Sequence, residues 1–81
     1  MSPREKAKEL IDKHVYYVQS SSAFGQMENA KACALITSKE NIESFEAIKK
    51  YCQFNSLDID HIIFEIRWWN EVIEHINNYE I

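Results

Sequence analysis

The sequence has one glycine and one proline among 81 residues. It is neither collagen-like, low-complexity nor disordered, because 46% of the residues are hydrophobic and the net charge is only −4. No apolar run approaches the ~18 residues that cross a bilayer, so we expect no membrane partner. The first ten residues carry charges where a secretory signal is apolar, so we expect no export. These absences predict one small domain over residues 1–81.

Cysteine is scarce as well. Cys33 and Cys52 allow at most one disulfide, and without an export signal we expect two reduced thiols. No CxxC or HxxxH pair is present, so the sequence predicts no metal site and no cofactor. Cys33 lies in an alanine-rich apolar segment that makes a thiol unreactive, and no spacing indicates a general acid–base pair. We therefore expect no enzymatic activity.

Positive charge is nearly absent from the last third of the chain. Residues 56–81 hold Arg67 alone against six acidic residues, a net of −5. A protein that binds duplex DNA normally presents a basic face, so we expect no duplex nucleic acid as a partner. The alternative, mimicry of nucleic-acid charge by this acidic segment, would rest on a weak excess of charge.

Helix signals are plentiful from the start of the chain. Ser2 and Glu5 have the spacing of a capping box, and Pro3 suits a first helical turn. An apolar face with spacings of three and four follows, which predicts a helix over about residues 3–19. The serines and the single glycine of residues 20–25 predict a loop that ends this helix.

The middle of the chain predicts one long helix. No glycine or proline occurs from residue 27 to residue 54, so we expect the central helix over about 27–54. The small residues of segment 30–34 indicate a close helix crossing. Residues 37–41 contain weak helix formers, so a kink there is the alternative.

A third helix is expected over about residues 60–79, with Asp58 or Asp60 near its start. Its apolar residues recur at intervals of four and three, the spacing of a two-heptad seam that packs helix against helix. The seam, which we predict to be the interface, consists of Ile62, Ile66, Trp69, Ile73 and Ile76. Segment 62–69 is rich in strand formers, so a strand there is the alternative. The fold class predicted is all-α, as a three-helix bundle or a helical hairpin with a long central helix.

Aromatic residues are concentrated near the end of the chain. Six lie in the last 31 residues, at positions 51, 54, 64, 68, 69 and 79. A core of this size rarely supplies more than ~3–5 kcal/mol, so small proteins often gain burial by association. We therefore expect a homo-oligomer in which some of these rings face a partner chain.

A ligand site is predicted around the lone cation of the acidic segment. Guanidinium and indole side by side suit stacking and phosphate contact. The candidate ligand-binding residues are Arg67, Trp68, Lys13 and Lys31. The alternative for Arg67 is an ion pair with Glu71 or Glu74. The stripe of His61, Trp68 and His75 is a further candidate ligand face, or simply a boundary beside the seam.

Three motifs together carry a family resemblance. They are PREKAKELIDK at 3–13, AKACALI at 30–36 and WNEVIEHI at 69–76. In this order and spacing they resemble small helical proteins of tailed bacteriophages and prophages, especially of Bacteroidota hosts. The sequence departs from that pattern directly after Ile36. The resemblance implies a phage accessory protein that acts in the bacterial cytoplasm, and it carries over no catalytic residue.

Two functions follow as hypotheses. In the first, an oligomer sequesters a small anionic ligand, such as a nucleotide signal of host immunity, in pockets between subunits. In the second, exposed aromatic residues bind a host or phage protein and inhibit or recruit it.

Overall fold

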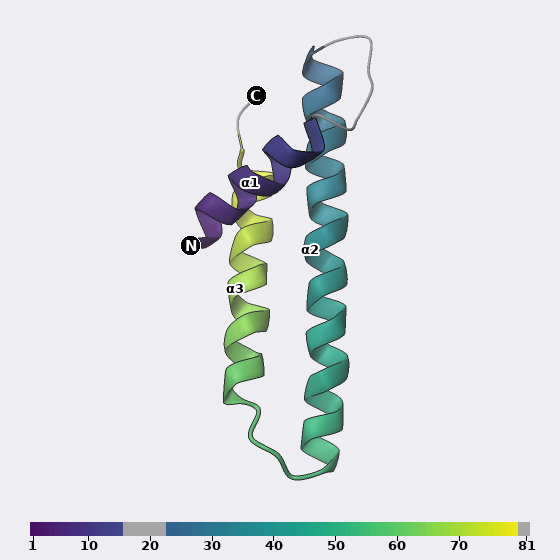
Figure 1. Cartoon of the computed structure of the whole chain (residues 1–81), viewed down its shortest axis with the longest axis vertical. Coiled ribbons are helices and arrows are strands. Elements are labelled where there is room, and N and C mark those ends of the chain that lie inside the picture. The colour runs from purple at the N-terminus through teal and green to yellow at the C-terminus, as the bar shows by residue number, and fades with distance from the viewer. Residues whose placement is uncertain (16–22, 80–81) are drawn as a thin grey trace.

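The computed structural model describes residues 1–15 and 23–79, and within them it contains three helices and no strand. They are α1 (Pro3–Val15), α2 (Ala23–Phe54) and α3 (Asp60–Asn77). Helices α2 and α3 form an antiparallel hairpin, and α1 crosses one end of it (Figure 1). The prediction of an all-α fold with a long central helix is confirmed, and segment 62–69 is helical rather than a strand.

The central helix begins four residues earlier than predicted. It starts at Ala23 and contains Gly25, so the prediction of a loop through residue 25 is wrong. A helical glycine costs about 1 kcal/mol relative to alanine, which packing can outweigh. Met27, half a turn further on, packs against the core and holds this end of α2 in place. Residues 16–19, predicted as the end of the first helix, lie outside the described residues.

No break interrupts α2 at residues 37–41. The polar side chains there bond back to the preceding turn: Ser38 Oγ donates to the Ala34 carbonyl at 2.9 Å, and Asn41 Nδ2 donates to the Thr37 carbonyl at 3.0 Å. Such bonds satisfy short polar side chains inside a helix. They allow Ser38 to be fully buried without an unsatisfied hydroxyl.

The predicted capping box is present at the start of α1. Ser2 Oγ accepts the Glu5 N–H at 3.1 Å, and Glu5 Oε1 accepts the Ser2 N–H at 3.2 Å. These bonds stabilise the charged carboxylate and hold the pKa of Glu5 below its ordinary value. At the start of α3, Asp58 Oδ1 accepts the Asp60 N–H at 3.0 Å, so Asp58 rather than Asp60 supplies the acceptor.

Removal of the Ser2 cap at the start of α1 gives a first prediction. We expect Ser2→Ala to cost about 1 kcal/mol and to lower the melting temperature by roughly 4–8 °C, because the first turn loses a side-chain acceptor. The pKa of Glu5 should rise toward its ordinary value. A group whose pKa is lowered by folding stabilises the fold above its unfolded pKa, so this part of the loss should fade as pH falls through the folded pKa. Thermal melts and NMR titration of the wild type and of the Ser2→Ala variant test the prediction. An unchanged Glu5 pKa in the variant would contradict it.

The core lies where the three helices meet. Its fully or almost fully buried members are Ala7, Leu10, Ile11, Ala30, Ala34, Val72 and Ile76. Alanines leave room for backbones to approach closely, and Ala30 and Ala34 of segment 30–34 are fully buried in this core. Trp68, Trp69 and Tyr79 pack against this core from its edge.

One end of the hairpin has no third helix. At 1.5 Å per residue, α1 is about 20 Å long and α2 about 48 Å. The shape is correspondingly elongated, with extents of 51 × 20 × 16 Å. Figure 1 shows α1 at one end of the hairpin and no described helix against α2 and α3 at the other end. This end therefore leaves more apolar surface in contact with solvent than the core end does.

The tip of the hairpin is a tight helix end. Ser56 has φ 57°, and the Leu57 N–H bonds to the Cys52 carbonyl at 2.8 Å. Glycine usually occupies such a left-handed position after a helix. The turn leaves Leu57 exposed beside Phe54 at the tip.

Candidate functional site

The four predicted ligand-binding residues do not meet within one chain. Lys31 Nζ donates to the Tyr79 carbonyl at 3.2 Å, at the end of the hairpin that α1 covers. Arg67 lies ten residues before the end of α3, about 15 Å away along the helix. Lys13 is an exposed residue of the last turn of α1. A pocket lined by all four would need more than one chain.

Arg67 and Trp68 stand in different surroundings. Trp68 packs edge-on against Trp69, with ring centroids 5.2 Å apart and planes at 84°, and both rings border the core. Arg67 is exposed, and in the described part of the chain no ion pair joins it to Glu71 or Glu74. The ion-pair alternative for Arg67 is therefore absent from this structure.

The predicted interface residues divide into two groups. Ile62 and Ile76 are buried inside the chain, whereas Ile66, Trp69 and Ile73 are half-buried. Val72, which lies on α3 beside the seam but is not part of it, is fully buried. The core face of α3 thus includes Val72 as well as Ile62 and Ile76, because α1 and α2 both pack on it. In this fold Ile62 and Ile76 offer no surface to a second chain, which corrects that part of the interface prediction.

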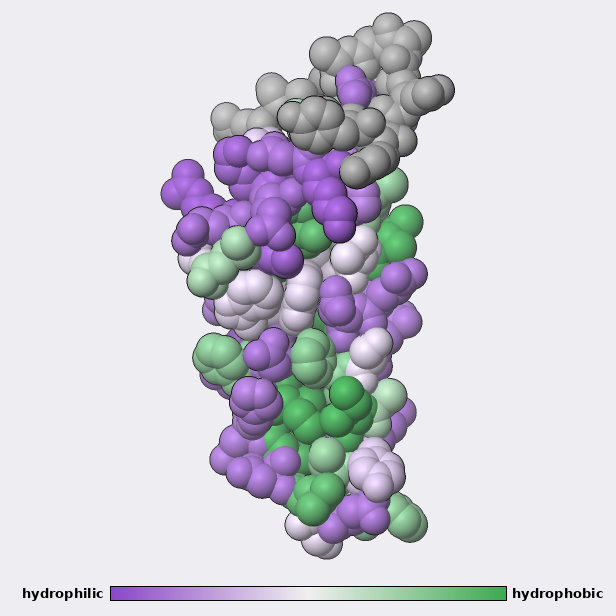
Figure 2. Space-filling view, viewed as in Figure 1, coloured by the Kyte–Doolittle hydropathy of each residue, from purple (hydrophilic) through white to green (hydrophobic). Residues whose placement is uncertain are grey.

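The exposed apolar residues gather instead at the tip of the hairpin. We call them the distal patch, which consists of Ile48, Tyr51, Phe54, Leu57 and Phe64. Phe54 is 90% exposed, Tyr51 66% and Phe64 61%. In the space-filling view, hydrophobic residues gather along the middle of the lower half of the molecule, between hydrophilic residues and below the polar surface of α1 (Figure 2).

The distal patch is large enough to contribute to an interface. An aromatic side chain has about 150–250 Å² of surface, so the three exposed rings present roughly 400 Å². The largest apolar patch on a typical single chain has about 300–600 Å² and is often functional. A standard interface buries about 800 Å² per partner, and the three rings alone supply about half of that. The distal patch is therefore the strongest candidate for an interface.

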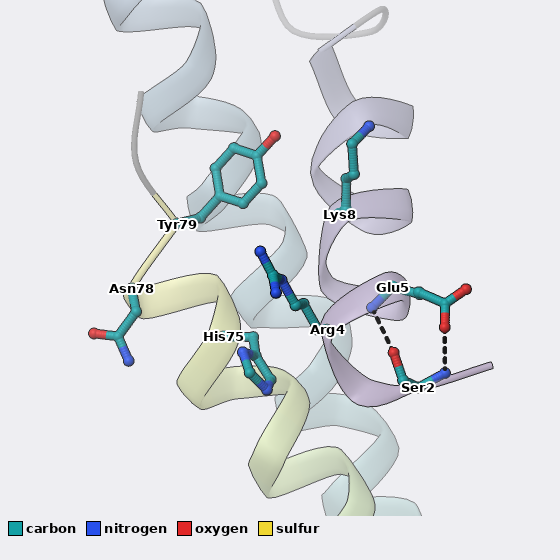
Figure 3. Close-up of a pocket in the computed structure, with 7 residues that line it drawn as sticks. All are labelled: Ser2, Arg4, Glu5, Lys8, His75, Asn78 and Tyr79. Atoms are coloured by element: carbon teal, nitrogen blue, oxygen red, sulfur yellow. Dashed lines mark hydrogen bonds between the residues drawn. The ribbon is translucent and has the colours of Figure 1, made fainter.

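A groove lies at the opposite end, between the first turns of α1 and the end of α3. It has a volume of about 790 Å³ and is lined by Ser2, Arg4, Glu5, Lys8, His75, Asn78 and Tyr79. Arg4 projects into it between the Tyr79 ring and His75 (Figure 3). Among the described residues, neither the Arg4 side chain nor the His75 side chain has a hydrogen-bond or ion-pair partner.

Some of the charged side chains around this groove already have a partner within the chain. Lys8 Nζ bonds to Asp12 Oδ2 at 2.6 Å, and this bond raises the pKa of Lys8 above its ordinary value. The Glu5 carboxylate is held by the Ser2 N–H and points away from His75 and Tyr79 (Figure 3). With His75 counted as neutral, the lining still carries two positive charges against one negative charge. The groove is thus locally positive in a chain of net charge −4.

Sequence reasoning missed the groove because no spacing indicates it. Arg4 and His75 lie at opposite ends of the chain, and they meet only because α1 crosses the end of α3. The distal patch was foreseen in part, since Tyr51, Phe54 and Phe64 belong to the predicted surplus of aromatic residues. Their positions on the hairpin tip depend on where α1 stops covering α2.

No family model, curated protein or solved structure matches this chain. Among residues 1–15 and 23–79, no three His, Cys, Asp or Glu side chains are placed to hold a metal ion. None of the helices described is both long and apolar enough to cross a bilayer. Cys33 and Cys52 are free thiols, both half-buried.

Proposed function

We propose that this protein is a non-catalytic binding protein that works as a homo-oligomer, assembled through the distal patch. The observation that carries the proposal is the exposure of Tyr51, Phe54 and Phe64 at the end of the hairpin that α1 leaves uncovered. Burial of these rings against another chain removes their apolar surface from water, which favours association.

A second copy fits this surface better than a strongly charged partner. Segment 48–64 carries two lysines and two aspartates, a net charge of zero with His61 neutral. Two copies therefore meet there without net repulsion. A two-fold axis at the patch would pair two hairpins into a four-helix arrangement, a stable way to bury helix faces.

The resemblance to phage proteins supports a more specific role. An accessory protein in the bacterial cytoplasm that binds a small anion, such as a nucleotide signal, fits a chain with a cationic groove. The second candidate is a module that binds a host or phage protein. It is favoured by the aromatic content of the patch, since such residues dominate the binding energy of protein interfaces.

Light scattering of the purified chain over a concentration series tests the proposal. We expect at least twice the mass of one chain at micromolar concentrations and above, with dissociation on dilution. A single-chain mass at every concentration would contradict self-association and favour the second candidate.

A further inference from the structure

We infer that the groove between α1 and α3 binds a small phosphate ester that carries a planar ring, of the kind represented by a nucleoside monophosphate. The inference rests on the proposed role in binding a small anion. It does not rest on self-association, because one chain forms the whole groove and the distal patch lies at the other end of the hairpin.

The cations of the groove have unused hydrogen-bonding capacity. A guanidinium offers five N–H donors in a planar fork that matches two phosphate oxygens, and Arg4 uses none of them within the described residues. An ammonium has three N–H donors, and Lys8 uses one of them in its bond to Asp12. The Glu5 carboxylate, the one acidic side chain among the lining residues, turns away from His75 (Figure 3). These features favour an anion with several acceptor oxygens.

The aromatic wall of the groove is held in place from behind. The Tyr79 N–H bonds to the Ile76 carbonyl at 3.2 Å, and the Tyr79 carbonyl accepts the Lys31 ammonium at 3.2 Å. The ring also packs against the core. A ring fixed in this way binds a planar group with little loss of conformational freedom. Lys31, predicted as a ligand residue, thus has a positioning role through Tyr79.

The size of the groove and its remaining polar groups fit such a ligand. Its volume of about 790 Å³ lies within the range of about 300–1,000 Å³ that is usual for small-molecule sites. The His75 ring lies on the α3 side near Arg4, where its donor and acceptor can contact the polar edge of a base, whereas the Asn78 amide points away from Arg4 (Figure 3). A bare phosphate would use the cations and leave the Tyr79 wall empty.

The two arginines of the sequence provide a matched test. ¹⁵N-labelled protein is titrated in low salt with adenosine monophosphate, inorganic phosphate or adenosine, and NMR shifts are followed. We expect adenosine monophosphate to shift residues 2–8 and 75–79 and to bind more tightly than either fragment. Arg4→Gln should weaken its binding at least about tenfold, whereas Arg67→Gln should leave it unchanged. Both arginines are exposed, so both variants should keep the wild-type helical circular dichroism.

The Tyr79→Leu variant tests the contribution of the ring to binding separately from that of the charged side chains. This change should reduce the preference for adenosine monophosphate over inorganic phosphate and leave phosphate binding itself intact. Equal effects of Arg4→Gln and Arg67→Gln, or shifts confined to other residues, would overturn the inference. So would the absence of any shift with adenosine monophosphate. Light scattering of the same samples reports self-association separately, so a monomer that binds the ligand would contradict the oligomer and leave the groove supported.

Discussion

Replacement of Phe54 and Phe64 by lysine is expected to convert the oligomer into single chains. Both rings are largely exposed within one chain, at 90% and 61%, so the fold has little need of them. In the proposed interface the rings are buried, and each lysine would place an unpaired charge there. Loss of a central aromatic contact often costs at least about 2 kcal/mol, so two such losses should raise the dissociation constant by at least about 100-fold. Sedimentation velocity at matched concentrations measures this change.

The matched control is Ile36→Lys. Ile36 is also an apolar residue of α2 that is 57% exposed, but it lies outside the distal patch. This variant should keep the wild-type mass. If it dissociates as completely as the double variant, added charge rather than loss of the patch explains the effect. If the double variant stays associated, the patch is not the interface.

Ile76→Ala is expected to unfold most of the protein. Ile76 is fully buried at the point where α1, α2 and α3 meet. Truncation of a buried isoleucine to alanine costs about 2–5 kcal/mol, through lost burial and the cavity left behind. A core of this size rarely supplies more than ~3–5 kcal/mol, so the change removes most of the stability. Urea denaturation followed by circular dichroism at one fixed protein concentration measures the loss.

Ile36→Ala is the matched control for that experiment. It removes the same atoms from an exposed position of α2, so it should shift the free energy of unfolding by no more than about 0.5 kcal/mol. Equal urea midpoints for the two variants would show that the three-helix core does not determine stability. The protein concentration must be fixed because self-association adds stability that depends on it.

Local patterns predicted the helices well. The capping box of Ser2 and Glu5 and the unbroken run after residue 27 are short-range signals, and each appears in the structure. Gly25 shows the limit of such signals. Its low helix propensity predicts a loop, but the packing of Met27 against the core is a tertiary effect that local preference does not include.

The heptad pattern of α3 was informative about packing, but two of its five residues are buried inside the chain rather than available to a partner. A seam at spacings of four and three shows that a helix packs on another helix, but it does not say which one. Because α1 and α2 both pack on α3, Val72 joins the core with Ile62 and Ile76, whereas Ile66, Trp69 and Ile73 of the seam stay half-buried. The uncovered surface follows from the short length of α1, which changes the packing of residues far away in sequence.

The groove depends on geometry that no local pattern encodes. Arg4 is an ordinary surface residue of an amphipathic helix, and His75 is one of three scattered histidines. Their common pocket exists because α1 crosses α3 near its last turn and because Lys31 fixes Tyr79 behind it. Ala7 and Ile11 of α1 share one buried core with Val72 and Ile76 of α3, which holds the two helices together at this crossing.

The most direct test of the central claim is an isotope-filtered NOE spectrum of a mixture of labelled and unlabelled chains, which reports contacts between copies only. We expect such contacts at the rings of Tyr51, Phe54 and Phe64, with none from α1. A spectrum in which the contacts between copies involve α1 and leave those rings without any would contradict an assembly through the hairpin tip.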